Sequence, residues 1–182
     1  IAEITFDLAQ KIEGRLIALG VSVFLTRSAS STPSELERIA FANNTEADLV
    51  ISLSVDSYPN EHAHGLSTYF YGNALHGIHS LVGEKFATIV QRELIARTDL
   101  LNTRTHAKTW NLLRLTKAPA VLLEIGYISH PKDASRLADA HFRDVVAEGL
   151  VIAIQRMYLS AEEDAKTGTL RIEDLRRAGI RR

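Results

Sequence analysis

Cysteine is absent from the 182 residues, which removes disulfides, thiolate catalysis and cysteine-ligated zinc as explanations of the fold or the function. Net charge is also nearly absent, because 21 basic side chains stand against 22 acidic ones. The chain therefore has no global attraction to nucleic acid or anionic lipid. No apolar run approaches the roughly 18 residues that a membrane span needs. We expect neither a nucleic-acid partner nor a membrane span.

The chain also lacks a methionine or a basic segment at its start, where Ile1 opens directly into a helical pattern. We expect no signal peptide in this sequence and interpret it as part of a longer polypeptide. The remaining composition, 46% hydrophobic and 24% charged, is that of one ordinary globular domain. At this length about 70% of the unfolded surface can be buried, so one core is sufficient without a structural metal.

Helical and strand patterns alternate along the chain. Apolar residues at three- and four-residue steps, followed by Gly20, predict a first helix over 2–19. Thr32 and Glu35 have the spacing of a capping box that opens a helix ending near Asn44. Other helices are expected over 76–98, from Pro131 and over 142–158, and strands over 21–26, 49–53, 66–71 and 118–124. The fold class predicted is α/β: a three-layer sandwich with a twisted, mostly parallel central sheet of about six strands flanked by helices.

The composition changes after Ser160, where acidic residues give way to an arginine-rich end. We therefore predict a domain over 1–159 and a polar, Arg-rich tail over 160–182. Thr167 and Thr169 flank a glycine in this tail and are candidate phosphorylation sites. A phosphate there would add nearly two negative charges, which could dock on an arginine cluster.

One carboxylate and several histidines carry the candidate chemistry. Glu124 ends a buried strand and has three interpretations: a catalytic remnant, a ligand-binding residue, or one half of an ion pair with a base such as Arg114. A serine triad of Ser54, Asp56 and His64 is disfavoured because the sequence has no G-x-S-x-G turn.

Other side chains that could carry chemistry also have simpler structural interpretations. His62 with His64, and His76 with His79 at a predicted helix start, have spacings that could hold a metal, but loop histidines are more often solvated. Trp110 is expected in the core or in the wall of a groove.

Four segments in fixed order resemble one family, the zinc-dependent N-acetylmuramoyl-L-alanine amidases called amidase-3. They are Gly20–Arg27, Glu37–Asn43, Ala47–Leu53 and Pro119–Ser129. The resemblance implies a site in which two histidines and a glutamate hold zinc, while a second glutamate transfers the proton of the zinc-bound water. That second glutamate corresponds to Glu124.

The metal positions depart from the family pattern. The family's first histidine belongs to a D-P-G-H-G-G strand that this sequence does not contain, so the domain lacks the family's first strand. The metal-binding glutamate falls at Ile1, and the second histidine falls at Ser54. Neither residue can replace a zinc donor. We therefore expect no metal, and treat Ile1 and Ser54 as degenerate metal positions and Glu124 as a vestigial general acid/base.

The chain is most similar to an actinobacterial subgroup of regulatory pseudo-amidases. The shared segments, which are not general amidase motifs, are 6–9, 13–15, 72–73, 93–98, 109–115 and 166–169. This resemblance implies a cytoplasmic regulator of peptidoglycan precursor synthesis. Its partners would be the enolpyruvyl transferase acting on UDP-N-acetylglucosamine, a Ser/Thr kinase and a phosphothreonine-binding domain.

Two alternatives stay open. The first is an active, extracytoplasmic zinc amidase that hydrolyses the lactyl-L-alanine amide of peptidoglycan, with missing ligands supplied by a preceding segment and by His62 or His64. The second is a sensor that binds muropeptide in the old groove without cutting it.

Overall fold

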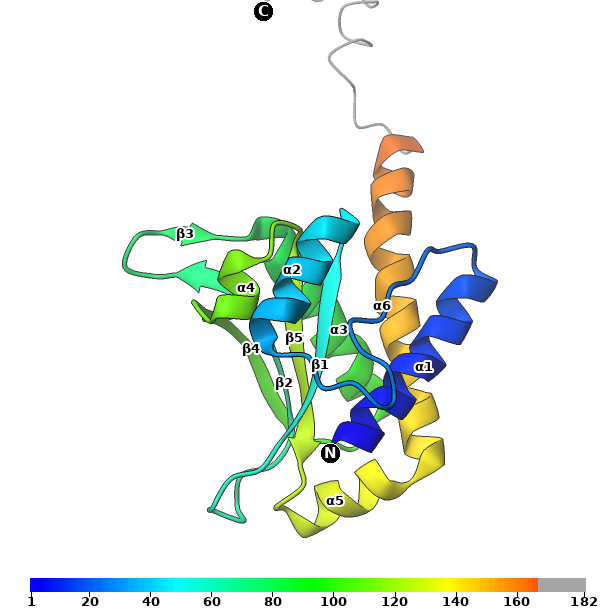
Figure 1. Cartoon of the computed structure of the whole chain (residues 1–182), viewed down its shortest axis with the longest axis vertical. Helices are drawn as coiled ribbons and strands as arrows, with labels where there is room; N and C mark the ends of the chain where they lie inside the picture. Colours follow the sequence, from blue (N-terminus) through cyan, green and yellow to red (C-terminus); the bar gives the residue numbers. More distant parts are fainter. Residues whose placement is uncertain (167–182) are drawn as a thin grey trace, which may run out of the picture.

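The computed structural model describes the backbone of residues 1–166 and the side chains of residues 1–158. Helices and strands are interspersed along it (Figure 1). In chain order the elements are α1 (Ala2–Ala18), α2 (Glu35–Thr45), β1 (Val50–Asp56), β2 (Leu66–Asn73), β3 (Ile78–His79), α3 (Leu81–Arg97), β4 (Asn102–Lys108), α4 (Asn111–Leu115), β5 (Ala120–Tyr127), α5 (Pro131–Ala138) and α6 (Ala140–Lys166).

The five described strands form one mixed sheet. Strand β5 lies between β1, which runs parallel to it, and β2, which runs antiparallel to it. Strand β2 also pairs with β4 in parallel and, at its far end, with the short β3 in antiparallel. The sheet is mixed rather than mostly parallel because β2 returns directly through the 57–65 loop, with no crossover helix, and runs opposite to β1. Strand β5 is therefore interior, and β1 is an edge.

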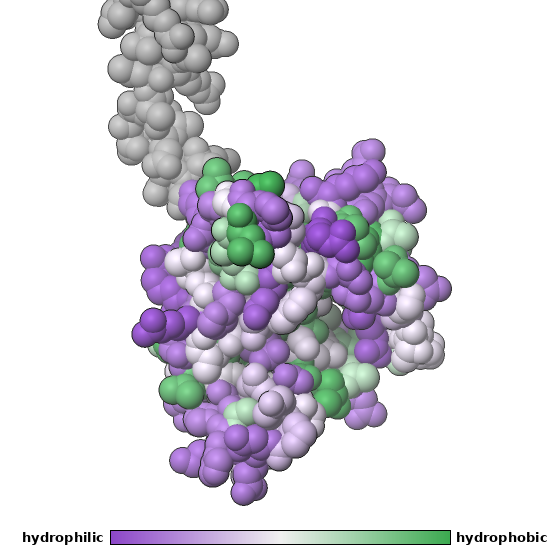
Figure 2. All heavy atoms as spheres, turned by 90° about the vertical axis from the view of Figure 1, so that its left-hand side faces the viewer, coloured by the Kyte–Doolittle hydropathy of each residue, from purple (hydrophilic) through white to green (hydrophobic). Residues whose placement is uncertain are grey.

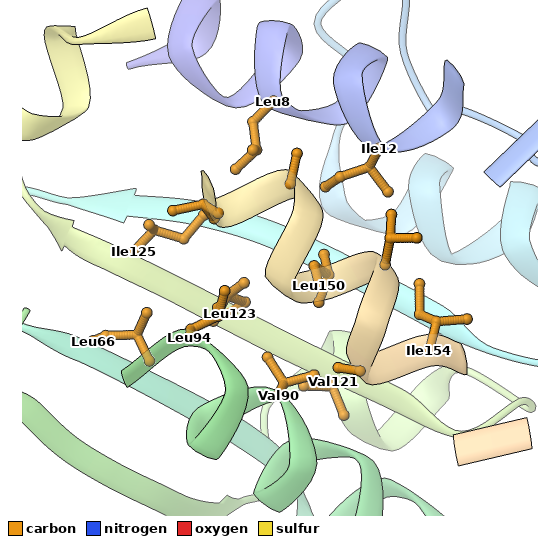
Figure 3. Packing of buried hydrophobic residues seen from close by; sticks show 14 of the residues in the cluster. Leu8, Ile12, Leu66, Val90, Leu94, Val121, Leu123, Ile125, Leu150 and Ile154 are labelled. Atoms are coloured by element: carbon orange, nitrogen blue, oxygen red, sulfur yellow. The ribbon is translucent and has the colours of Figure 1, made fainter. Parts of the chain in front are cut away.

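Helices cover both faces of the sheet, which confirms the predicted three-layer α/β fold. Helices α1, α3 and α6 lie on one face, and α2 and α4 lie on the other (Figure 1). Figure 3 shows the core between the sheet and the first group of helices. Its labelled side chains are Leu8 and Ile12 from α1, Val90 and Leu94 from α3, Leu150 and Ile154 from α6, and Leu66, Val121, Leu123 and Ile125 from the strands.

The first predicted strand, over 21–26, is wrong. The segment belongs to no ladder of the described residues. Its alternating β-branched pattern favours a strand, yet a strand exists only where another strand supplies hydrogen-bond partners. The segment lines a cavity beside β1 without pairing with it.

The predicted helix over 76–98 begins too early. Residues 72–79 form a β-hairpin in which Gly72 pairs with His79, and α3 begins only at Leu81. Ser80 caps that helix by accepting a hydrogen bond from Gly83 N at 3.0 Å. His76 and His79 are therefore not an i,i+3 pair on a helix.

Two other predicted helix ends differ from those observed. The capping box is formed by Ser34 and Glu37, two residues later than Thr32 and Glu35. Helix α6 continues past Tyr158 to Lys166, so the first part of the predicted tail is helical. Thr167 and Thr169 lie outside the described residues.

On the face shown in Figure 2, hydrophobic residues form separate patches between hydrophilic ones. None of the helices described has the length and the apolar character that crossing a membrane requires.

Candidate functional site

Glu124 occupies the centre of the sheet, on the face opposite the main core. Its neighbours in β5, Leu123 and Ile125, point into the core, so alternation along the strand turns Glu124 to the other face. In the ladders it lies between Ser54 of β1 and Ser67 of β2. A carboxylate is thus flanked on both sides by a serine.

Tyr127 is the direct partner of Glu124. Its hydroxyl donates a hydrogen bond to Glu124 Oε1 at 2.6 Å. The backbone makes this reach possible through Gly126, whose φ of 104° is readily adopted only by glycine. The β1–β5 register shifts at the same point, so that Tyr127 comes opposite Asp56. The irregularity at the end of β5 therefore turns a tyrosine back over the carboxylate three residues earlier.

The environment of Glu124 raises the pKa of its carboxyl group. Its residue surface is only 8% exposed. Burial raises the pKa of Glu124 above its ordinary value, the negative charge of Asp56 raises it further, and the hydrogen bond from Tyr127 opposes them. Burial and the adjacent Glu124 likewise raise the pKa of Tyr127 above its ordinary range.

Aromatic rings line the open side of this carboxylate. Tyr69, on β2, contacts the Trp110 ring at 4.7 Å and the His106 ring at 5.6 Å between centroids. The Lys108 ammonium lies 5.6 Å from the centre of the Trp110 ring. The indole is 42% exposed, so this group presents a partly open aromatic surface.

Asp133 holds the backbone around the site in place. It is completely buried, and its Oδ2 accepts hydrogen bonds from Gly65 N at 2.9 Å and Tyr127 N at 3.2 Å. Its Oδ1 accepts one from Arg136 Nη1 at 3.1 Å. One carboxylate therefore joins the start of β2, the end of β5 and α5.

The residues present do not fit a zinc ion. Ser54 stands beside Glu124, and Ile1 is 54% exposed at the start of α1. Within residues 1–158, no three His, Asp or Glu side chains converge in a way that could hold a metal. A lone carboxylate with a serine neighbour offers too few good donors.

The loop histidines make local contacts. The His64 ring stacks on the His130 ring with centroids 4.4 Å apart, and its Nδ1 lies 2.7 Å from His62 O. Among the described residues, no hydrogen bond joins His64 to Ser54 or Asp56, as a serine triad would require.

Of the three interpretations of Glu124, the ion pair with Arg114 is not formed among the described residues. Arg114 Nη2 instead donates to Asn111 Oδ1 at 2.9 Å on the same helix. The tyrosine in the E-x-G-Y segment was the signal for the true partner, because a glycine between two polar residues at a strand end favours a bulge that could bring them together.

The fold and the site define a class of α/β protein. In this class helices cover both faces of the sheet, and a glutamate is buried near the end of an interior strand. Among solved structures, the catalytic domain of the N-acetylmuramoyl-L-alanine amidase CwlV from Paenibacillus polymyxa matches with a TM-score of 0.77 and 27% identity, over 87% of this chain and 84% of that one. The amidase AmiC2 of Nostoc punctiforme, at 24% identity and a TM-score of 0.77 over 87% of this chain and 83% of that one, shares the fold.

The chain belongs to the N-acetylmuramoyl-L-alanine amidase family, whose sequence profile matches residues 2–156. It is 41% identical over 174 residues to a protein named N-acetylmuramoyl-L-alanine amidase CwlM from Mycobacterium tuberculosis. That match covers 96% of this chain but 43% of the relative, so the chain spans less than half of that protein's length.

Proposed function

We propose that this chain is a catalytically inactive amidase-like domain that regulates peptidoglycan precursor synthesis by binding another protein. The inactive state is supported by the position of Ser54, which lies directly beside Glu124 in the ladder between β1 and β5. The family resemblance implies a zinc-binding histidine at this position, and a serine hydroxyl is a poor substitute for imidazole. Water near Glu124 would then lack the activation that a hydrolase needs.

The hydrogen bond at Glu124 supports the same proposal. Its Oε1 accepts a hydrogen bond from the Tyr127 hydroxyl at 2.6 Å. One oxygen of the carboxyl group is therefore engaged by a protein donor rather than free to accept a proton from water.

The partner proposed is the enolpyruvyl transferase that acts on UDP-N-acetylglucosamine, in the cytoplasm. It rests on the segments shared with actinobacterial pseudo-amidases and on the 41% identity to the Mycobacterium tuberculosis relative. Phosphorylation of Thr167 or Thr169 by a Ser/Thr kinase would be the switch, read by a phosphothreonine-binding domain.

Metal analysis and a hydrolysis assay test the inactive state together. We expect no stoichiometric zinc in the purified chain and no cleavage of the lactyl-L-alanine amide of a muropeptide, with no difference for Glu124→Gln. Ser54→Ala is the matched control, because it removes a hydroxyl from the same ladder position. Bound zinc with hydrolysis that disappears in Glu124→Gln would establish the active zinc amidase instead.

The turnover rate of the purified enolpyruvyl transferase tests whether the domain regulates that enzyme. We expect a higher rate when the domain is added, and a further change after kinase treatment that is lost when Thr167 and Thr169 are both replaced by Ala. An unchanged rate, with no complex in sedimentation, would exclude this partner.

The exposed aromatic group supports a second candidate, a muropeptide sensor. Trp110, Tyr69 and His106 form a partly open surface beside a carboxyl group and several hydroxyls, a combination that suits a sugar or peptide ligand. Trp110 is the only tryptophan of the chain, so its fluorescence reports on this surface directly. A change that saturates with muropeptide and disappears in Tyr69→Ala would support the sensor, and no change at millimolar ligand would exclude it.

A further inference from the structure

Three arginines surround one buried carboxylate where α3 packs against α6. The side chain of Glu93, on α3, is only 4% exposed. Arg97 Nη1 donates to Glu93 Oε2 at 2.5 Å and to Glu93 O at 3.0 Å. Arg156, on α6, places Nη1 2.8 Å from Glu93 Oε1, and Arg92 places Nη2 3.6 Å from the same oxygen. Three guanidinium groups therefore share a single carboxylate.

Two of these arginines are sufficient to stabilise Glu93. A buried carboxylate needs a partner for each of its oxygens. Arg97 reaches one oxygen and Arg156 reaches the other. Arg97 also lies across Gly149 of α6, where an added Cβ would be 3.2 Å from Arg97 Cδ. Arg97 and Arg156 thus join α3 to α6 around Glu93.

Arg92 adds a positive charge that this structural role does not explain. Neighbouring residues of a helix do not face each other, so Arg92 approaches Glu93 only by bending its long side chain across the helix surface. At 3.6 Å, its Nη2 is beyond normal hydrogen-bond distance from Glu93 Oε1. The Arg92 side chain is also 64% exposed, and ion pairs of such exposed groups contribute little to stability.

The cluster has an excess of positive charge that is open to solvent. Among the described residues, no Asp or Glu other than Glu93 forms an ion pair with any of the three arginines. Three positive charges therefore stand against one negative charge, in a chain whose formal net charge is -1. Arg92 and Arg156 approach the same Glu93 oxygen and both side chains are more than half exposed, so one ligand can contact both.

We propose that this cluster binds a phosphate monoester, held between Arg92 and Arg156 above Glu93. A phosphate monoester carries nearly two negative charges near neutral pH, which matches the charge excess of the cluster. Its oxygens accept paired hydrogen bonds from the planar fork of a guanidinium group. Because phosphate is tetrahedral, it can accept from two such groups at once, whereas a carboxylate has only two oxygens and one charge. The same phosphate chemistry is present in a free phosphorylated metabolite and in a phosphorylated side chain.

Titration of the whole chain with inorganic phosphate tests the proposal. The side-chain Nε–H resonances of Arg92 and Arg156 report on the site in heteronuclear NMR. We expect both resonances to shift along one saturable curve as phosphate is added. Sodium chloride at the same ionic strength should give no such curve, because screening alone does not saturate a specific site. Shifts that are no different in phosphate and in chloride would overturn the proposal.

Substitution of the exposed arginines tests which groups bind. Arg92→Gln removes a guanidinium group that makes no close contact with Glu93, so the unfolding midpoint should stay unchanged while the phosphate affinity falls at least about tenfold. Arg156→Gln should weaken phosphate binding by a similar factor. Arg114→Gln is the matched control, because it removes an exposed guanidinium group from α4 and should leave the affinity unchanged. Equal affinities in Arg92→Gln and in the original chain would also overturn the proposal.

A kinase-treated chain identifies the source of the phosphate group. This experiment rests on the phosphorylation of Thr167 or Thr169 proposed above, and mass analysis confirms the modification. If the phosphate belongs to the chain itself, the Arg92 and Arg156 resonances are already shifted after treatment and respond no further to inorganic phosphate. Resonances that are unchanged by treatment and still titrate with inorganic phosphate would assign the site to a free phosphorylated metabolite. Failure of the proposed regulation leaves the titration with inorganic phosphate intact, so the two proposals fail separately.

Discussion

The Tyr127 hydroxyl donates to Glu124 Oε1 at 2.6 Å, three residues away on the same strand. This hydrogen bond lowers the pKa of Glu124 against the larger effect of burial. Tyr127→Phe removes the donor and leaves the ring. We therefore expect the Glu124 carboxyl to titrate at a higher pH in NMR, and the free energy of unfolding to fall by about 1 kcal/mol.

The control for this variant is Tyr58→Phe, because Tyr58 is 55% exposed. It should leave both the Glu124 titration and the unfolding midpoint within error. A Tyr127→Phe variant that leaves the Glu124 titration unchanged would contradict the hydrogen bond.

Glu124 should also make stability depend on pH. Because burial raises its pKa in the folded state, the folded protein binds more protons than the unfolded chain between the ordinary carboxyl pKa and the raised one. The free energy of unfolding therefore falls as pH rises through that window, and the loss persists above it. Glu124→Gln removes this loss and keeps an acceptor for Tyr127.

Denaturant unfolding of Glu124→Gln and of the original chain at several pH values measures this effect. We expect the variant to gain stability relative to the original chain as pH rises from about 4 toward neutrality. Glu148→Gln, on the exposed side of α6, controls for the loss of one carboxylate. A stability difference that is constant across this range would disprove the assignment.

Asp133 should be among the least replaceable polar residues. Asp133→Asn replaces one oxygen by an NH2 group, which then faces either the two backbone donors at Oδ2 or the Arg136 donor at Oδ1, inside a completely buried site. We expect a loss of roughly 3 kcal/mol or more in urea unfolding. Asp139→Asn, at an exposed helix end, should cost under about 1 kcal/mol. Similar costs for the two variants would refute this role of Asp133.

We expect replacement of glycine by alanine to have opposite effects on stability at two positions, Gly149 and Gly14. A Cβ on Gly149, in α6, would lie 2.8 Å from Leu94 Cδ2 and 3.2 Å from Arg97 Cδ of α3, and Leu94 is completely buried. Gly149→Ala should therefore destabilise the fold by about 1 kcal/mol or more, despite the better helix propensity of alanine.

Gly14→Ala is the matched case in α1, because a Cβ there meets nothing within 4 Å. It should stabilise the fold by about 0.5–1 kcal/mol. Thermal unfolding of both variants measures the two effects. A Gly149→Ala variant as stable as the Gly14→Ala variant would show that α3 and α6 are not packed this closely.

Local patterns determined much of the fold. The 3.6-residue apolar period predicts α1 correctly, and the apolar run before Glu124 predicts β5, because each pattern reports the face that one element buries. The family motifs also locate Glu124 and Ser54, whose neighbouring positions in the ladder could not be read from sequence.

Predictions from the sequence failed where the secondary structure of one segment depends on pairing with another segment. Residues 21–26 have a strand pattern but no partner in the described chain, and 76–79 belong to a hairpin where the start of a helix was expected. Strand β4 was missed because its exposed, polar residues lack the apolar alternation of a buried strand.

By itself the sequence determined the layer architecture and the family, and it predicted Ser54 at a position where the family resemblance implies a histidine, because these depend on residue identity and local period. Only the tertiary structure decided that Tyr127 and Asp56 surround Glu124, that Asp133 holds three backbone segments together, and that β1 lies at the edge of the sheet formed by the described residues. These relationships arise from strand register and from a glycine-dependent bulge, which join residues through space and leave no period in the sequence.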